Sequence, residues 1–169
     1  LRYGYEAERP STETFETVST EETITQEFIA REYYLKGIEF VFINLAEDGN
    51  GELDFRVLDS DGRIKANSEI AISSVTAGEW EFIPLMGRLK AGESYILEIS
   101  AKDCSIPPYV LAREKKTVGE NTVLTASGAE TSLELLNAYG FAVSASRLER
   151  LLITVMLAVC LFGLWIFWN

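Results

Sequence analysis

The sequence predicts an all-β fold, a sandwich or barrel of eight or nine short strands, followed by one transmembrane α-helix. Three observations predict it. Short apolar runs recur at spacings of roughly ten residues, with turns rich in Gly, Asp, Asn and Pro between them. No long amphipathic helical pattern occurs before residue 144. Residues 151–168 then form an uninterrupted uncharged stretch. The three expected regions are an extended N-terminal segment at 1–21, a β-domain at 22–143 and a membrane helix at 144–169.

The first strands of the domain differ in how many faces are apolar. Residues 1–21 are rich in Glu, Thr and Ser, with one edge strand expected around 13–18. In 23–30, alternate positions place four residues on one face: Ile24, Gln26, Phe28 and Ala30. Residues 37–45 are apolar on both faces, which predicts a central strand covered on both sides.

The next segments alternate more cleanly. In 52–59, the pattern predicts Leu53, Phe55 and Val57 inside, with Asp54 and Arg56 outside. The turn DSDG then predicts a hairpin with a return strand from residue 63. In the strand at 79–85, the same period places Trp80 and Phe82 inside. The remaining expected strands lie at 95–100, 110–112, 121–125 and 132–143.

The C-terminal run has the length of a membrane span. At a helical rise of about 1.5 Å per residue, residues 151–168 extend roughly 27 Å, close to the thickness of the bilayer hydrocarbon. Trp165 and Trp168 lie near its end, where indole rings favour the membrane interface. The alternative is a buried core helix, but a soluble helix of this length normally shows a polar face. The sequence therefore predicts the membrane as a partner.

Composition excludes several function classes. The formal net charge is −11, so phosphate backbones are repelled and no nucleic-acid partner is expected. The chain has no histidine, which removes the commonest general base and metal ligand. Of its two cysteines, Cys160 lies inside the apolar run and is a poor partner for Cys104. No disulfide framework is therefore predicted. No catalytic residue is identified. A carboxylate-based hydrolase is the remaining enzyme hypothesis, and it requires two acidic side chains facing each other across a cleft at about 5 to 9 Å.

Two sets of residues are candidates for ligand contact. Tyr33, Tyr34 and Tyr109 lie beside turns, where exposed rings can stack on sugars. The other set is the acidic loop at 47–54, where Asp48, Asn50 and Glu52 have the spacing of the first ligands of an EF-hand loop. Leu53 stands where that loop needs glycine, and no helix precedes it, so a Gly-rich turn without a metal is the preferred interpretation. No cofactor is expected, with structural calcium at this loop as the alternative.

Four segments in order carry a resemblance: ITQEFIA, GIEFVFINL, GELDFRVLDSDGRIKA and GEWEFIPLMGRLKAGESYILEIS. Together they resemble the jelly-roll, carbohydrate-binding-module-like β-sandwich domains of bacterial multi-spanning membrane proteins of the cell-envelope glycosyltransferase and polysaccharide-assembly type. The resemblance covers about residues 22–143. It implies a jelly-roll-like sandwich of about eight strands. Because these motifs are strand and turn patterns, they carry no sugar-binding residue across.

The resemblance also bears on location. Arg147 and Arg150 precede the apolar run, and the positive-inside rule would place the folded domain in the cytoplasm. Domains of the type it resembles lie outside the cytoplasmic membrane, which implies that an earlier transmembrane helix precedes Leu1. The expected location is the cell membrane, with the β-sandwich on the extracytoplasmic side.

Two non-enzymatic functions follow as hypotheses. The first is a membrane-tethered, non-catalytic module that binds cell-envelope glycan or assists polysaccharide assembly. The second is a structural, sensor or protein-interaction module that docks a protein subunit and has no sugar ligand. The second hypothesis predicts an exposed apolar or aromatic patch on one sheet.

Overall fold

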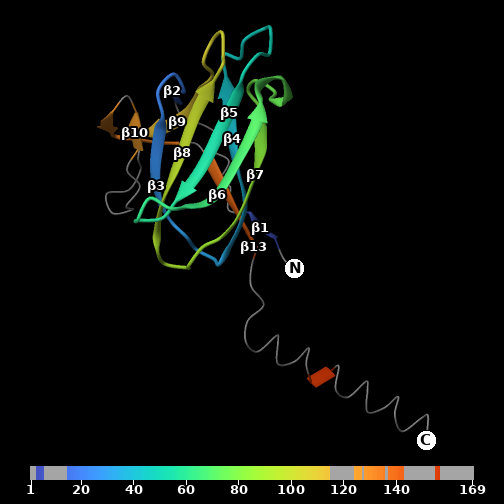
Figure 1. Ribbon diagram of the computed structural model, residues 1–169, viewed down its shortest axis with the longest axis vertical. Coiled ribbons are helices and arrows are strands. Elements are labelled where there is room, and N and C mark those ends of the chain that lie inside the picture. The colour runs from blue at the N-terminus through green and yellow to red at the C-terminus, as the bar shows by residue number, and fades with distance from the viewer. Residues whose placement is uncertain are drawn as a thin grey trace, which may run out of the picture.

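The computed structural model describes residues 15–114, 124–126, 128–135, 137–142 and 155–156, together with the backbone of 3–5. Residues 3–5 and the described residues from 15 to 142 form an all-β structure with one short 3₁₀ turn, η1, at Ile72–Ser74 (Figure 1). The strands are β1 Tyr3–Tyr5, β2 Glu16–Ser19, β3 Ile24–Ile29, β4 Tyr34–Ile43, β5 Glu52–Leu58, β6 Ile64–Ala71, β7 Trp80–Arg88, β8 Ser94–Lys102, β9 Tyr109–Glu114, β10 Leu124–Ala126, β11 Ala129–Thr131, β12 Leu133–Leu135 and β13 Asn137–Ala142.

The strands form two antiparallel sheets, which confirms the predicted β-sandwich. The first sheet has the order β1-β13-β4-β9-β12, with β7 paired to the other side of β4 and β2 paired to β9. The second has the order β11-β10-β3-β8-β5-β6. Neighbours distant in sequence, such as β3 with β8 and β13 with β4, are compatible with a jelly roll.

The core lies between the inner faces of the two sheets. Its centre is an aromatic cluster, in which the ring centroids of Phe40 and Phe55 are 5.8 Å apart and those of Phe42 and Phe55 are 6.2 Å apart. All three side chains are fully buried. Since Phe40 and Phe42 belong to β4 and Phe55 belongs to β5, this cluster joins the two sheets. Burial of large aromatic side chains on both inner faces is what a sandwich requires.

The inward faces of β3, β4 and β5 follow the predicted alternation. The four predicted residues of β3 are buried, and so are those of β5: Ile24, Gln26, Phe28, Ala30, Leu53, Phe55 and Val57. Asp54 lies on the outer face, as predicted, but only 4 % of its side chain is exposed, because Arg56 and Lys102 cover its carboxylate.

A buried polar side chain also links the sheets. The Gln26 amide oxygen accepts a 2.7 Å hydrogen bond from the backbone N–H of Leu135. Gln26 lies on β3 of the second sheet and Leu135 on β12 of the first. Because a buried amide costs free energy unless it is paired, this bond explains why a polar residue is tolerated on the inward face.

The edges of the two sheets meet at β6 and β7. A Cβ atom built on Gly87 of β7 would lie 2.7 Å from the carbonyl oxygen of Lys65 and 2.9 Å from the Cβ of Ala66, both on β6. Only glycine allows this approach. The close contact brings the edge of the second sheet against the edge of the first.

The connections gather at two opposite ends of the sandwich (Figure 1). The turns β3–β4, β5–β6 and β7–β8 lie at the end where β13 finishes, because Ala142 pairs with Tyr34 at the start of β4. We call this the exit end, and define it as those turns with two residues on each side: 28–35, 57–65 and 87–95. The connections β2–β3, β4–β5, β6–β7 and β8–β9 lie at the opposite end. We call it the far end, and define it in the same way: 18–25, 42–53, 70–81 and 101–110.

The predicted membrane helix at 144–169 falls outside the described residues, apart from Val155 and Met156, which are helical. Across the described part of the chain, no helix combines the length and apolar character of a membrane span. The membrane helix therefore stays a prediction.

Candidate binding surface

An apolar strip runs along the outer face of β7. The four residues at alternate positions of this strand point away from the core: Trp80, Phe82, Pro84 and Met86. We call them the β7 strip. Met86 is 74 % exposed and Phe82 is 44 % exposed, whereas their neighbours Ile83 and Leu85 are buried on the inner face. Large apolar side chains in a row on a sheet face make this strip a candidate binding surface.

Phe82 lies over two glycines of the neighbouring strands. A Cβ atom built on Gly37 of β4 would come within 2.6 Å of two ring carbons of Phe82, and one on Gly140 of β13 would lie 3.6 Å from the ring. Gly37 and Gly140 are paired across the two strands. The ring therefore covers backbone where no side chain stands, a known way of packing glycine within a sheet.

Charged residues lie beside the β7 strip rather than in it. Glu39 of β4 pairs directly with Phe82, and Arg88 at the end of β7 pairs with Tyr34. Directly opposite residues of antiparallel strands have Cβ atoms about 4.5–5.5 Å apart. Glu39 is thus the residue directly across from Phe82 on the same outer face of the sheet. A ring face beside a hydrogen-bond acceptor can stack on a ligand and orient one of its hydroxyl groups.

The three predicted tyrosines are not brought together. Tyr33 and Tyr34 are 49 % and 46 % exposed at the exit end. Tyr109 is half-buried and pairs with Ile43, at the other end of β4. At about 3.3 Å per residue, the length of β4 separates Tyr34 from Tyr109 by roughly 30 Å. Tyr34 adjoins the β7 strip, whereas Tyr109 belongs to a different surface.

The predicted calcium loop is held by its own side chains. The Asp48 carboxylate accepts hydrogen bonds from the backbone N–H of Asn50 (3.2 Å), from its side-chain amide (3.0 Å) and from the Ser105 hydroxyl (3.2 Å). The backbone bond from Asn50 is the main reason that the pKa of Asp48 lies below its ordinary value. Glu52 begins β5 and is exposed. Within the described ranges, no three His, Cys, Asp or Glu residues are grouped as metal ligands.

Cys104 is a free, half-buried thiol beside this loop. Its Sγ lies 3.1 Å from the Lys102 carbonyl oxygen, to which it donates. Burial raises the pKa of the Cys104 thiol, which disfavours the reactive thiolate at neutral pH. The geometry is that of a packing residue, since a Cβ on Gly51 would meet this sulfur at 2.5 Å.

The β7 strip is an exposed apolar surface that the sequence interpretation missed. Trp80 and Phe82 were expected in the core, but Trp80 is half-buried and Phe82 is exposed. Both faces of β7 are largely apolar, so the strand period cannot choose between them. Glu81 occupies an inward-parity position, but it lies next to the β6–β7 connection, where its carboxylate accepts a 2.8 Å hydrogen bond from the Thr76 backbone N–H. Pro84 was the available signal, since it stands at the same parity as Phe82 and is seldom buried.

A scan against protein-family models found no match to this chain, and a search of curated proteins found no significant match.

Proposed function

We propose that this chain is a membrane-tethered, non-catalytic β-sandwich module on the extracytoplasmic side, which binds cell-envelope glycan through the outer face of β4 and β7. The observation that carries the proposal is the exposed ring of Phe82 over Gly37 and Gly140, with Glu39 directly opposite. A flat aromatic face favours the apolar face of a sugar ring, while the carboxylate accepts hydrogen bonds from its hydroxyl groups. The jelly-roll-like order of the strands supports it.

The test is titration of the full chain in detergent with purified envelope polysaccharides. Phe82→Ala is expected to weaken binding about tenfold, a loss of about 1.4 kcal/mol, because it removes the flat apolar face on which the sugar ring stacks. Ile29→Ala is the matched control, since Ile29 is comparably exposed, at 47 %, on the second sheet. The glycan assignment is wrong if no envelope polysaccharide binds, or if both variants bind the polysaccharide as tightly as the unsubstituted chain does.

A second candidate function, docking of a protein subunit, is favoured by a different observation. Met86 is 74 % exposed and Pro84 is exposed, and neither side chain offers a hydrogen bond to a sugar. Met and aromatic residues are enriched at protein interfaces. A photo-crosslinking residue at position 86 should then capture one defined subunit in membranes, whereas the same residue at position 96 of β8 should not. Capture at both positions, or at neither, would count against a specific protein partner.

A further inference from the structure

The two ends of the sandwich differ in charge although the chain as a whole is strongly acidic. The far end has eight acidic residues and one basic residue: Glu21, Glu22, Glu47, Asp48, Glu52, Glu79, Glu81 and Asp103, with Lys102. The exit end has four acidic and five basic residues: Glu32, Asp59, Asp61 and Glu93, with Arg31, Arg63, Lys65, Arg88 and Lys90. An anionic surface therefore repels the far end much more strongly than the exit end.

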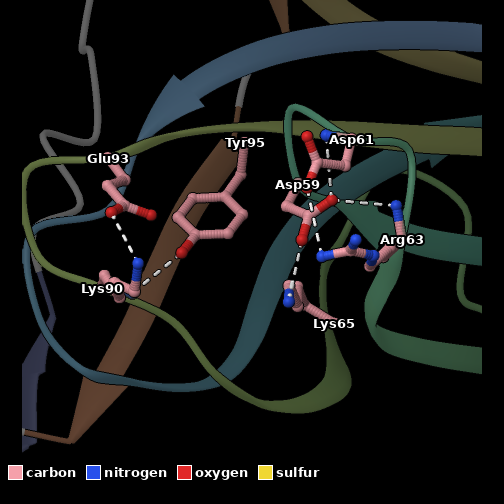
Figure 2. A network of polar contacts seen from close by, with 7 residues as sticks. All are labelled: Asp59, Asp61, Arg63, Lys65, Lys90, Glu93 and Tyr95. Atoms are coloured by element: carbon pink, nitrogen blue, oxygen red, sulfur yellow. Dashed lines mark hydrogen bonds and ion pairs between the residues drawn. The ribbon is translucent and has the colours of Figure 1, made fainter.

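Most basic side chains of the exit end are held in ion pairs that solvent can reach. Figure 2 shows Lys90 beside Glu93 and Lys65 beside Asp59. The two charged groups are 3.0 Å apart in the first pair and 2.8 Å apart in the second. The Lys90–Glu93 pair has 74 % and 51 % of its side chains exposed, so it stabilises little and a phosphate group can compete for the lysine. The Lys65–Asp59 pair is more shielded, with 33 % and 15 % exposed.

Exposed apolar side chains also concentrate at the exit end. It carries four large ones: Ile29, Tyr33, Tyr34 and Ile64. Among the described residues of the far end, Ile106 is the one large exposed apolar side chain. Tyrosine rings favour the headgroup region of a bilayer, because the ring is apolar and its hydroxyl group can hydrogen-bond with water. Basic and tyrosine side chains together match an anionic lipid surface better than they match bulk water.

The chain connectivity places the same end near the predicted membrane span. β13 ends at Ala142 beside Tyr34, and eight residues, 143–150, separate it from the apolar run that starts at Leu151. Fully extended, such a linker reaches at most about 28 Å. The far end lies a further length of β4 away, roughly 30 Å at about 3.3 Å per residue. Eight residues are therefore too few to let the far end face the membrane while the exit end points away from it.

We propose that the exit end of the sandwich docks on an anionic lipid surface, with the turns at 30–33, 59–63 and 89–93 facing the headgroups. This inference rests on the proposed membrane tether and specifies which end of the domain the bilayer touches. The far end and its acidic loops then point away from the membrane. The β7 strip lies along the side of the sandwich, where a glycan can still reach Phe82.

The experiment compares two single-cysteine variants of the full chain, in a background with Cys104→Ser and Cys160→Ser. Ala91→Cys reports on the exit end and Ala77→Cys on the far end; both alanines are exposed turn residues. Each is labelled with an environment-sensitive fluorophore and reconstituted in vesicles that contain a headgroup-attached quencher. In vesicles of phosphatidylcholine and phosphatidylglycerol, the label at 91 is expected to be quenched several-fold more than the label at 77.

Two further arms separate the possible explanations. Quenching at 91 is expected to fall in vesicles of phosphatidylcholine alone, because the anionic lipid is absent. It is also expected to fall in the Arg88→Glu/Lys90→Glu chain, because surface charges attract only groups within about 10 Å. Equal quenching at both sites overturns the proposal, and equal quenching in neutral and anionic vesicles overturns its electrostatic basis. Flotation with the vesicles is measured first. A chain that does not float disproves the tether, whereas a chain that floats but shows unselective quenching disproves the docking alone.

Discussion

The outer faces of the two sheets differ in their central features, a set of ion pairs on the second sheet and an apolar strip on the first, although the second sheet also exposes Ile29 and Ile96. On the second sheet, the Asp54 carboxylate receives Arg56 at 2.6 Å and Lys102 at 2.8 Å, and Lys102 also reaches Glu69 at 3.0 Å. On the first sheet, the β7 strip presents Phe82 and Met86 to solvent. The inner faces of both sheets are mostly apolar, with Gln26 as a buried polar exception. Both sheets contribute to the same core, and their outer faces differ in the side chains that they present to solvent.

The largest effect is expected from neighbouring residues on opposite faces of β7. Leu85→Ala should lower the free energy of unfolding by about 2–5 kcal/mol, because it opens a cavity in the core. Met86→Ala should change it by no more than about 0.5 kcal/mol, since Met86 is largely exposed. Denaturant unfolding of the full chain in detergent checks both. A comparable loss for both variants would mean that the β7 strip is part of the packed structure rather than a free surface.

The next largest effect on stability is expected at the two glycines under Phe82. Gly37→Ala should destabilise the fold by about 1–3 kcal/mol, because overpacking must displace the neighbours of the new methyl group. Here those neighbours are the Phe82 ring and the Ile83 carbonyl oxygen, each 2.4 Å from the added Cβ. Gly140→Ala is the control, because its closest contacts, at 3.4 and 3.6 Å, are ordinary ones. The same unfolding measurement applies. Equal stability of the two variants would show that Phe82 can leave Gly37 without cost.

The ion pairs of the second sheet are expected to give an effect of similar size. Asp54→Asn should lower the free energy of unfolding by about 1–3 kcal/mol, the usual scale for losing hydrogen bonds to a charged group. Asp61→Asn removes an ion pair whose side chains are 73 % and 62 % exposed, and should cost less than about 1 kcal/mol. Unfolding at pH 7 compares the two. If they cost the same, burial of Asp54 adds nothing to its ion pairs.

The smallest expected effect is a pH dependence. Burial raises the pKa of Asp54, but the hydrogen bond from Lys102 and the positive charge of Arg56 outweigh it and hold this pKa below its ordinary value. A depressed pKa in the folded state contributes stability above the unfolded pKa, about 3.9, which is lost as the pH falls through the folded value. The stability difference between the unsubstituted chain and Asp54→Asn should therefore shrink below about pH 4. A difference that stays constant from pH 7 to pH 3 would contradict the assignment.

The sequence predicted the strands better than it predicted their outer surfaces. Clean alternation, as at Leu53, Phe55 and Val57, identified inward positions, because one apolar face leaves a single way to place the strand. It also located the hairpin between β5 and β6. It merged or missed several short strands: β1, for example, is three residues long and forms only by pairing with β13. Such a strand depends on a partner distant in sequence and leaves little local signal.

The candidate site was the least predictable feature. Tyr34 was correctly expected to be exposed, but no local pattern indicated that Phe82 lies beside its strand and over Gly37 and Gly140. The ring is placed by the pairing of β4 with β7, which joins Glu39 to Phe82 across 43 positions, and with β13, which joins Gly37 to Gly140 across 103 positions. Asp54 differs in the opposite direction, because it is less exposed than its strand pattern predicts. The pattern places it on the outer face, and Lys102 of β8 covers it there.

The sequence by itself determined the all-β class, the inward alternation of the central strands and the acidic balance of the chain, because these depend on local period and composition. Tertiary structure decided which face of β7 is exposed, which carboxylate is buried and which loops share an end. Strand pairing sets these features, and a period of two is symmetric between the faces of a strand that is apolar on both. The choice of face belongs to the neighbouring strands rather than to β7 itself.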